Sequence, residues 1–210
     1  MIDPSTIRMD EFLFGWYGAR NSRHFFMPAV GRWLPDPLKH WYEVSARLVE
    51  HRGGVKHVLL PEEIQAVDGK AIFLIDATGD WRWSFDVEKP SVVYDGECCE
   101  EWRQSEESLA QFLTHHSVQE AIYGARRLYR HPHVHKDLLP GVLAGLEQVD
   151  FPRWRWSAEG CRYFMGDRIV AEIVPDFGPP DYYQVNVASP ERRRLVYLNR
   201  FDGIDWRKVG

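Results

Sequence analysis

The stretch "IFLIDATGDWRWSFDVEKPSVVYD", Ile72–Asp95, decides the fold because it holds three strand patterns in succession. Its opening apolar run is typical of a strand buried on both faces, whereas "DWRWSFD" alternates and places Trp81, Trp83 and Phe85 on one face. The intervening "DATG" has the chemistry of a tight turn, with Asp favoured at its start and Gly at its end. The stretch therefore predicts an antiparallel sheet with one aromatic face.

Long helices are predicted before and after this stretch. "WLPDPLKHWYEVSARLVEHRGG", residues 33–54, has an Asp-Pro start, apolar residues at helical spacing and a Gly-Gly stop. The second helix is expected to begin at Ser105, a capping residue, with Glu106 and Glu107 in its first turn, where the helix dipole favours anions. Together these elements predict an α+β fold, a twisted antiparallel sheet flanked by helices.

The C-terminal part of the chain predicts strands rather than helices. "RWRWSA", "CRYFM", "RIVAEIV", "DYYQVNVA" and "RRLVYLNRF" each fit a strand, and the Gly-Asp pair after the second has hairpin-turn chemistry. This pattern predicts an additional C-terminal antiparallel β meander. We therefore expect residues 1–130 to form an α+β domain, residues 131–150 to connect, and residues 151–210 to form a β-rich extension or subdomain.

Composition favours a cytoplasmic globular protein. The 210 residues are 44% hydrophobic, and no apolar run approaches the roughly 20 residues that cross a bilayer. The N-terminal "MIDPSTIRMDEF" has acidic residues where a secretory signal carries Lys or Arg. Cys98 and Cys99 are neighbours, which strains a disulfide between them, and Cys161 stands apart. We expect a reducing compartment and no contact with a membrane.

Charge is distributed unevenly along the chain. Residues 1–123 carry 12 basic and 20 acidic residues, a net charge of -8, whereas residues 124–210 carry 14 and 11, a net charge of +3. An acidic first part favours a cationic partner and repels phosphates, so it disfavours nucleic acid. "RWRW" and "ERRR" in the second part could form a basic and aromatic nucleic-acid footprint, but strand alternation already explains the first, with its tryptophans inward and its arginines outward.

Catalytic motifs are not evident. The sequence holds no G-x-S-x-G elbow, P-loop or dinucleotide fingerprint, and Cys98 and Cys99 lie among glutamates that would raise the pKa of a thiol. Asp76 and Asp80 fit turn positions better than a pair of catalytic carboxylates. We expect no catalytic residues and no cofactor.

One short histidine motif is the weak candidate for a metal site. In "HPHVH", His131, His133 and His135 alternate, so they would point the same way on a strand, and imidazole binds zinc. No carboxylate or cysteine follows at the usual ligand spacing. A small metal-dependent hydrolase that uses these histidines or the two aspartates above is one alternative reading of the sequence.

Several segments between Trp33 and Tyr123 occur in an order that resembles the SUKH superfamily, which includes the yeast Knr-type cell-wall-assembly regulator and many bacterial immunity proteins. The matching segments are "LPDPLKHWYEVS", "AIFLIDATGDWRWSFD", "VVYD", the tryptophan of "EEW" and "SLAQFL". They cover somewhat under half of the chain. The sequence departs from the family pattern at "HRGG", at the short "EKPS" and in the strands after Phe151.

The resemblance implies a non-enzymatic binding protein, and many bacterial members of the superfamily neutralise a toxin inside the producing cell. We therefore expect an immunity protein that binds the toxic domain of a cognate, basic toxin. An acidic, aromatic-rich surface suits such a partner. A carbohydrate-binding or cell-wall regulatory module with a row of exposed tryptophans is a further alternative. The residues expected to contact the partner are Asp80, Arg82, Asp86, Glu97, Glu100, Glu101 and Trp102.

Overall fold

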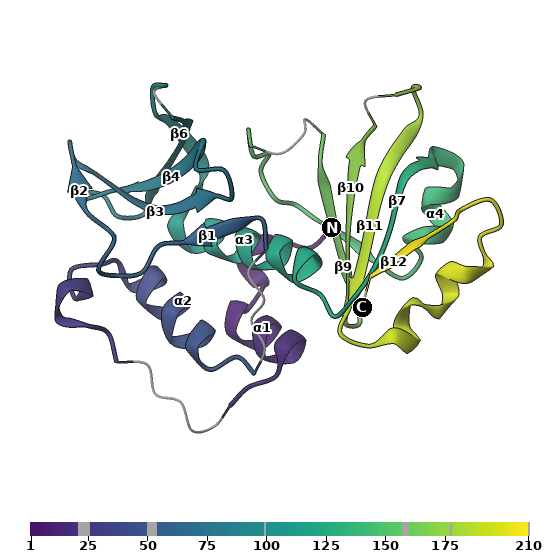
Figure 1. The fold of residues 1–210 in the computed structure, drawn as a ribbon, viewed down its shortest axis with the longest axis horizontal. Helices are drawn as coiled ribbons and strands as arrows, with labels where there is room; N and C mark the ends of the chain where they lie inside the picture. The colour runs from purple at the N-terminus through teal and green to yellow at the C-terminus, as the bar shows by residue number, and fades with distance from the viewer. Residues whose placement is uncertain (21–25, 50–53, 99, 157–159, 177, 210) are drawn as a thin grey trace. The chain divides into compact units, whose positions relative to one another are not determined.

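The computed structural model describes residues 1–20, 26–49, 54–98, 100–156, 160–176 and 178–209 (Figure 1). Its contacts divide the chain into two compact units. The first unit is Arg8–Glu120, and the second combines Met1–Ile7 with Ala121–Gly210. The boundary falls inside one helix. Residues 131–150, which the sequence predicts to be a connecting segment, contribute two strands and a short helix to the second unit.

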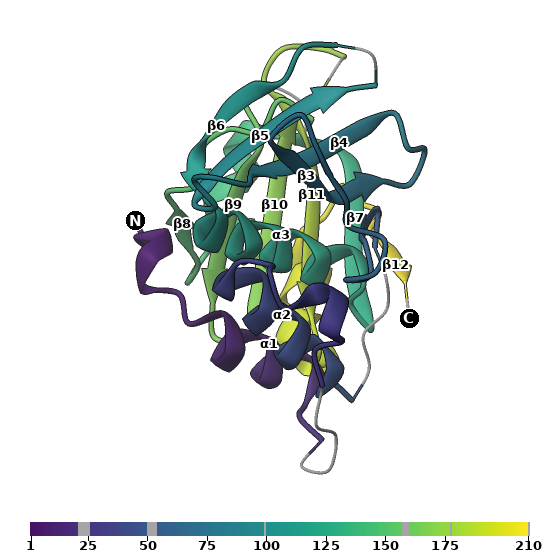
Figure 2. The same ribbon diagram turned by 90° about the vertical axis from the view of Figure 1, so that its left-hand side faces the viewer.

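The first unit is an antiparallel sheet with helices on one side. Its strands lie in the order β1-β3-β4-β5-β6, and β2 pairs with β3. The strands are β1 (Lys56–Val58), β2 (Ala66–Val67), β3 (Lys70–Asp76), β4 (Trp81–Asp86), β5 (Val92–Glu97) and β6 (Arg103–Ser108). The helices are α1 (Met9–Tyr17), α2 (Asp36–Ala46) and α3 (Leu109–Tyr123), and a 3-10 turn, Ala29–Gly31, precedes α2. Figures 1 and 2 show the three helices on the same side of the sheet.

Aromatic packing joins this sheet to α3. Trp83 and Phe112 have ring centroids 6.1 Å apart, and Phe73 meets Phe112 edge-on at 5.6 Å. All three side chains are at most 1% exposed. The predicted alternation in β4 is therefore confirmed: Trp81, Trp83 and Phe85 are all buried on one face.

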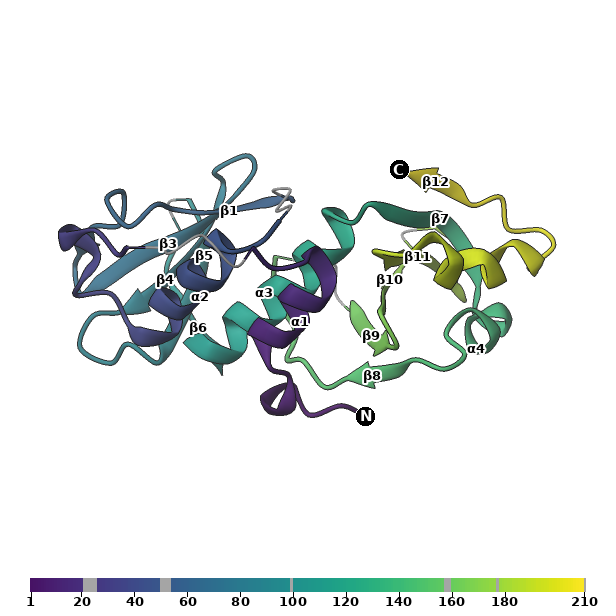
Figure 3. The same cartoon turned by 90° about the horizontal axis from the view of Figure 1, so that it is seen from below.

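The second unit contains the C-terminal meander. Its strands lie in the order β12-β7-β11-β10-β9-β8, all antiparallel (Figure 3). They are β7 (Arg127–His135), β8 (Glu147–Val149), β9 (Arg162–Gly166), β10 (Ile169–Pro175), β11 (Tyr182–Ser189) and β12 (Arg207–Val209). The helical segments are α4 (Leu139–Val142) and the 3-10 turns Pro4–Thr6, Lys136–Leu138 and Arg192–Arg200. Leu195, Leu198 and Val142 of these segments pack on one face of the sheet with Ile173 and Val187.

The predicted start of the second long helix is wrong. Residues 103–108 form β6, and α3 begins only at Leu109. The helix is capped by Ser108: its hydroxyl accepts the Gln111 N–H at 3.3 Å, and the Gln111 side-chain oxygen accepts the Ser108 N–H at 3.1 Å. This reciprocal pair is a capping box, three residues beyond the capping residue that the sequence suggested.

Other predicted elements also differ. The helix that starts at Asp36 ends at Ala46, well before the Gly-Gly pair, of which Gly53 lies outside the described residues. "RWRWSA" contains no strand in its described part, Arg153–Trp156, although Trp154 is buried as alternation suggested. "RRLVYLNRF" is a 3-10 helix, because Leu195 and Leu198, three residues apart, fall on the same side of a three-residue turn.

Candidate outer-face binding site

The sheet of the first unit has a second face, opposite its three helices, which we call the outer face. Strand alternation assigns side chains to it, because the neighbours of Trp83 and Phe85 along β4 must point away from the core. The pairing register then aligns outer-face residues across the strands: Ile72 faces Ser84, Ser84 faces Tyr94 and Tyr94 faces Gln104. Ile75 faces Arg82, and Arg82 faces Gly96.

Two cations lie over aromatic rings on the outer face. The Arg82 guanidinium lies 5.6 Å from the ring centroid of Trp102, and the Lys70 ammonium lies 4.3 Å from that of Tyr94. Gly96 stands opposite Arg82 in the register and beside Trp102, and a Cβ there would make an ordinary contact 3.7 Å from Trp102 Cε3. Such contacts fix long side chains at a surface.

These two cations form no ion pair with any residue that the structure describes. In the part of the chain that the structure describes, neither Arg82 nor Lys70 has a carboxylate within 4.0 Å. Arg82 Nε is also shielded from solvent and donates no hydrogen bond to a described residue. Ser84 lies between the two cations along the sheet, is 0% exposed, and its hydroxyl has no partner among the described atoms.

Several exposed carboxylates lie at one end of this sheet. Asp80, Glu97 and Glu101 are exposed at the end of the sheet where β4 begins and β5 ends. Backbone pairing links the start of β4 to the end of β5 here. Trp81 pairs with Glu97, and the Cys98 N–H donates to the Asp80 carbonyl at 2.6 Å. Glu100 is exposed in the turn between β5 and β6.

Asp86 lies at the opposite end of β4. Its carboxylate accepts the backbone N–H groups of Glu88 and Lys89 at 2.9 and 2.8 Å, so it shapes the turn into β5. The structure therefore places Arg82 and Trp102 in contact on the outer face and Asp86 at the far end of β4 on that face. Asp80, Glu100 and Glu101 are exposed near the start of β4 or in the turn after β5, whereas Glu97 stands opposite Trp81 in the register and so shares the side of the core-facing residues.

Asp76 has a structural role. Its carboxylate accepts the Thr78 hydroxyl at 2.8 Å and the Trp81 N–H at 3.1 Å, and Gly79 takes the positive φ of 79° that the turn needs. The carboxylate thus closes the β3–β4 turn. Asp80, which follows the turn, is exposed rather than paired with Asp76 in a pocket.

The three histidines of the motif lie on β7, and each has its own contacts. His131 Nδ1 accepts the His133 N–H at 3.1 Å, His133 pairs with Asp176, and His135 Nδ1 lies 3.3 Å from Asp137 Oδ2. Within the described ranges no three His, Cys, Asp or Glu side chains are grouped so that they could hold a metal ion.

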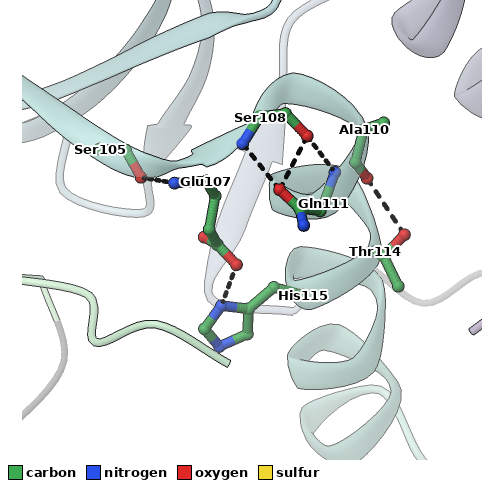
Figure 4. A network of polar contacts seen from close by, with 7 residues as sticks. All are labelled: Ser105, Glu107, Ser108, Ala110, Gln111, Thr114 and His115. Atoms are coloured by element: carbon green, nitrogen blue, oxygen red, sulfur yellow. Dashed lines mark hydrogen bonds and ion pairs between the residues drawn. The ribbon is translucent and has the colours of Figure 1, made fainter. Parts of the chain in front are cut away.

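Three buried polar clusters were missed by the sequence reasoning. In the first, His115 Nδ1 of α3 lies 3.0 Å from Glu107 Oε1 of β6, and both side chains are at most 2% exposed (Figure 4). Figure 4 also shows the Ser108–Gln111 cap one turn earlier on the same helix. The pair joins α3 to the edge strand, and only the correct boundary between β6 and α3 brings the two residues together.

The second cluster contains an ion pair in the core of the first unit. Lys56 Nζ lies 4.0 Å from Glu120 Oε1, with side chains 0% and 4% exposed. Backbone N–H groups of residues 54–56 also face this carboxylate. Gly54 is required beside it, since a Cβ there would lie 1.9 Å from Glu120 Oε2. Burial raises the pKa of Glu120, and Lys56 and these N–H groups only partly oppose that shift.

The third cluster surrounds Glu172 in the middle of the second sheet. Its carboxylate accepts hydrogen bonds from the Tyr123 hydroxyl at 2.7 Å, the Asn186 amide at 2.8 Å and the Tyr163 hydroxyl at 3.1 Å. Arg130 Nε in turn donates to Asn186 Oδ1 at 2.8 Å. Burial, followed by the charge of Glu172, raises the pKa of both Tyr123 and Tyr163, so both phenols stay protonated donors.

Neutral donors therefore satisfy a carboxylate that is only 1% exposed. The half-buried Cys161 thiol also reaches Glu172, at 3.6 Å. The cluster is a satisfied polar centre of the second core.

The tryptophans mostly belong to the cores. Of the nine in the sequence, six are buried, Trp102 and Trp156 are half-buried, and Trp33 is 45% exposed. No row of exposed tryptophans appears in the described ranges.

The first unit also has two adjoining hollows, of about 480 and 520 Å³, where α2 and α3 begin. They share Asp36, Pro37 and Ala110, and apolar side chains form most of their lining. None of the predicted contact residues lines either of them.

The chain matches no known protein family, no curated protein and no solved structure. Among the described residues, every helix is too short or too polar to cross a bilayer.

Proposed function

We propose that this protein is a non-enzymatic binding protein whose outer face grips a basic protein partner. One observation carries the proposal: exposed Asp80, Glu97, Glu100 and Glu101 lie at the end of the sheet that holds the Arg82–Trp102 pair. Tryptophan, tyrosine and arginine are the residue types that dominate binding energy at protein interfaces, and the outer face presents Trp102, Tyr94 and Arg82. A carboxylate rim speeds the encounter with a cationic surface.

The resemblance to immunity proteins suggests the class of protein to which the partner belongs. We propose that the partner is a cognate toxin and that binding covers its toxic domain inside the producing cell. The net charge of -8 on residues 1–123 supports a basic partner over nucleic acid.

Co-expression tests this proposal. Cells that produce the protein encoded beside this one should survive only when the present chain is made with it. Replacing Glu97, Glu100 and Glu101 together by Lys should abolish that protection and weaken binding of the purified pair by about a hundredfold or more, because like charges would then meet across the interface. Calorimetry at low and high salt measures the loss.

A matched variant separates charge at this site from charge in general. Glu43 and Glu62 are exposed elsewhere in the first unit, so their replacement by Lys should leave protection intact. Equal survival with and without the protein, or an equal loss from both sets of substitutions, would contradict the proposal.

A further inference from the structure

The charges of the outer face form a pattern with two signs. Arg82 and Lys70 form no ion pair within the described ranges, and carboxylates stand at both ends of β4, with Asp80 just before the strand and Asp86 opposite Lys70 in the register. A rim of one sign around a centre of the other calls for a partner with the inverse arrangement. The centre is therefore specific for a feature that overall charge does not reveal.

Unsatisfied polar atoms mark the same centre. Arg82 Nε is shielded from solvent without a described acceptor, and the Ser84 hydroxyl is fully buried without a described partner. Both lie on the outer face of β4, two residues apart. Buried donors without partners are uncommon and costly, so a group that accepts from them on binding recovers that cost.

The side chains above Ser84 are movable. Lys70 crosses from β3 toward the ring of Tyr94, and Ser84 stands between these two strands in the register. A lysine stem has many rotamers, so a partner can displace it without moving the backbone. Arg82 keeps its place more firmly, because its planar group rests on Trp102.

We propose that the partner of this face presents a single carboxylate, from Asp or Glu, to Arg82 and Ser84, within a segment that is otherwise basic. The carboxylate accepts hydrogen bonds from Arg82 Nε and from the Ser84 hydroxyl, and its negative charge attracts the positive charges of Arg82 and Lys70. Flanking lysines or arginines meet Asp80, Glu97, Glu100 and Glu101. A polyanion such as nucleic acid does not fit, since its further phosphates would face that rim. This inference rests on the proposed function.

Two synthetic peptides test this inference, because the two possibilities predict opposite orders of their affinities. One is Lys-Lys-Val-Glu-Val-Lys-Lys, and the other has Gln at its centre. The acidic rim alone favours the Gln peptide, because that peptide carries the larger positive charge. A carboxylate site at the centre predicts the opposite, with the Glu peptide bound about tenfold more tightly, since a hydrogen bond between charged groups exceeds the lost rim attraction. Calorimetry with the full chain measures both affinities.

Variants locate the effect. Arg82→Gln should reverse the order of the two peptides, whereas Arg32→Gln, which changes an exposed arginine outside the sheet, should preserve it. Tighter binding of the Gln peptide to the unaltered protein would overturn the inference and leave the proposed function standing. If neither peptide binds, or if single-stranded DNA binds better than both, the basic-partner proposal fails together with it.

Discussion

At the scale of single residues, the outer face depends on the contact between Arg82 and Trp102. Arg82 meets Trp102 beside Gly96, its partner in the register between β4 and β5. From the sequence alone, Arg82 and Trp102 were each predicted as contact residues, but not as a pair. Their pairing follows from the register between β4 and β5, which no local pattern encodes.

Glu120 gives a prediction at the same scale, through the pH dependence of stability. Burial raises its pKa above the ordinary value of 4.5, so the folded state holds its proton more tightly than the unfolded state does. Its contribution is fully present below pH 4.5 and is lost as the pH rises through the folded pKa. The stability of Glu120→Gln relative to the unaltered protein should therefore improve as the pH rises above 4.5.

Urea unfolding at a series of pH values measures that difference. Glu43→Gln changes an exposed glutamate of α2 and serves as the control. A constant difference for Glu120→Gln as well would show that the buried carboxylate titrates alike in the folded and unfolded chain.

At the scale of elements, the boundary between β6 and α3 turns on which serine caps the helix. Ser108 exchanges two hydrogen bonds with Gln111, whereas the Ser105 hydroxyl only accepts the Glu107 N–H at 3.2 Å within a strand. Ser108→Ala should cost about 1 kcal/mol of stability, as loss of a helix cap does, and Ser105→Ala should cost less. Denaturant midpoints compare the two, and the reverse order would place the helix start back at Ser105.

Elements were predictable where the local pattern admitted one reading. The alternation of β4 buries Trp81, Trp83 and Phe85, and only a strand places all three on one face. By contrast, the apolar residues of "RRLVYLNRF" suit both a strand and a 3-10 helix with three residues per turn. The segment forms the 3-10 helix because Leu195 and Leu198 then both pack in the second core. In "RRLVYLNRF", tertiary packing thus decided between the two structures that the pattern allowed.

At the scale of the whole molecule, the buried polar clusters were beyond local reasoning. Tyr123 and Glu172 are 49 positions apart in the sequence, and three further strands bring Arg130, Tyr163 and Asn186 to them. A glutamate inside "RIVAEIV" looks like the polar position of a half-exposed strand. Only the complete sheet shows that both of its faces are buried there.

The two units give the last prediction, because each has its own core and its own polar cluster. Glu172→Gln replaces an acceptor of three hydrogen bonds by an amide that brings two donors, which should cost about 1–3 kcal/mol in the second unit. Hydrogen exchange followed by mass spectrometry should then speed up in β9, β10 and β11 and stay unchanged in β3, β4 and β5, whereas Ser108→Ala should give the opposite pattern. The exposed Glu147→Gln should change neither. Because α3 runs across the boundary between the units, equal acceleration in both sheets would mean instead that this helix makes them unfold as one.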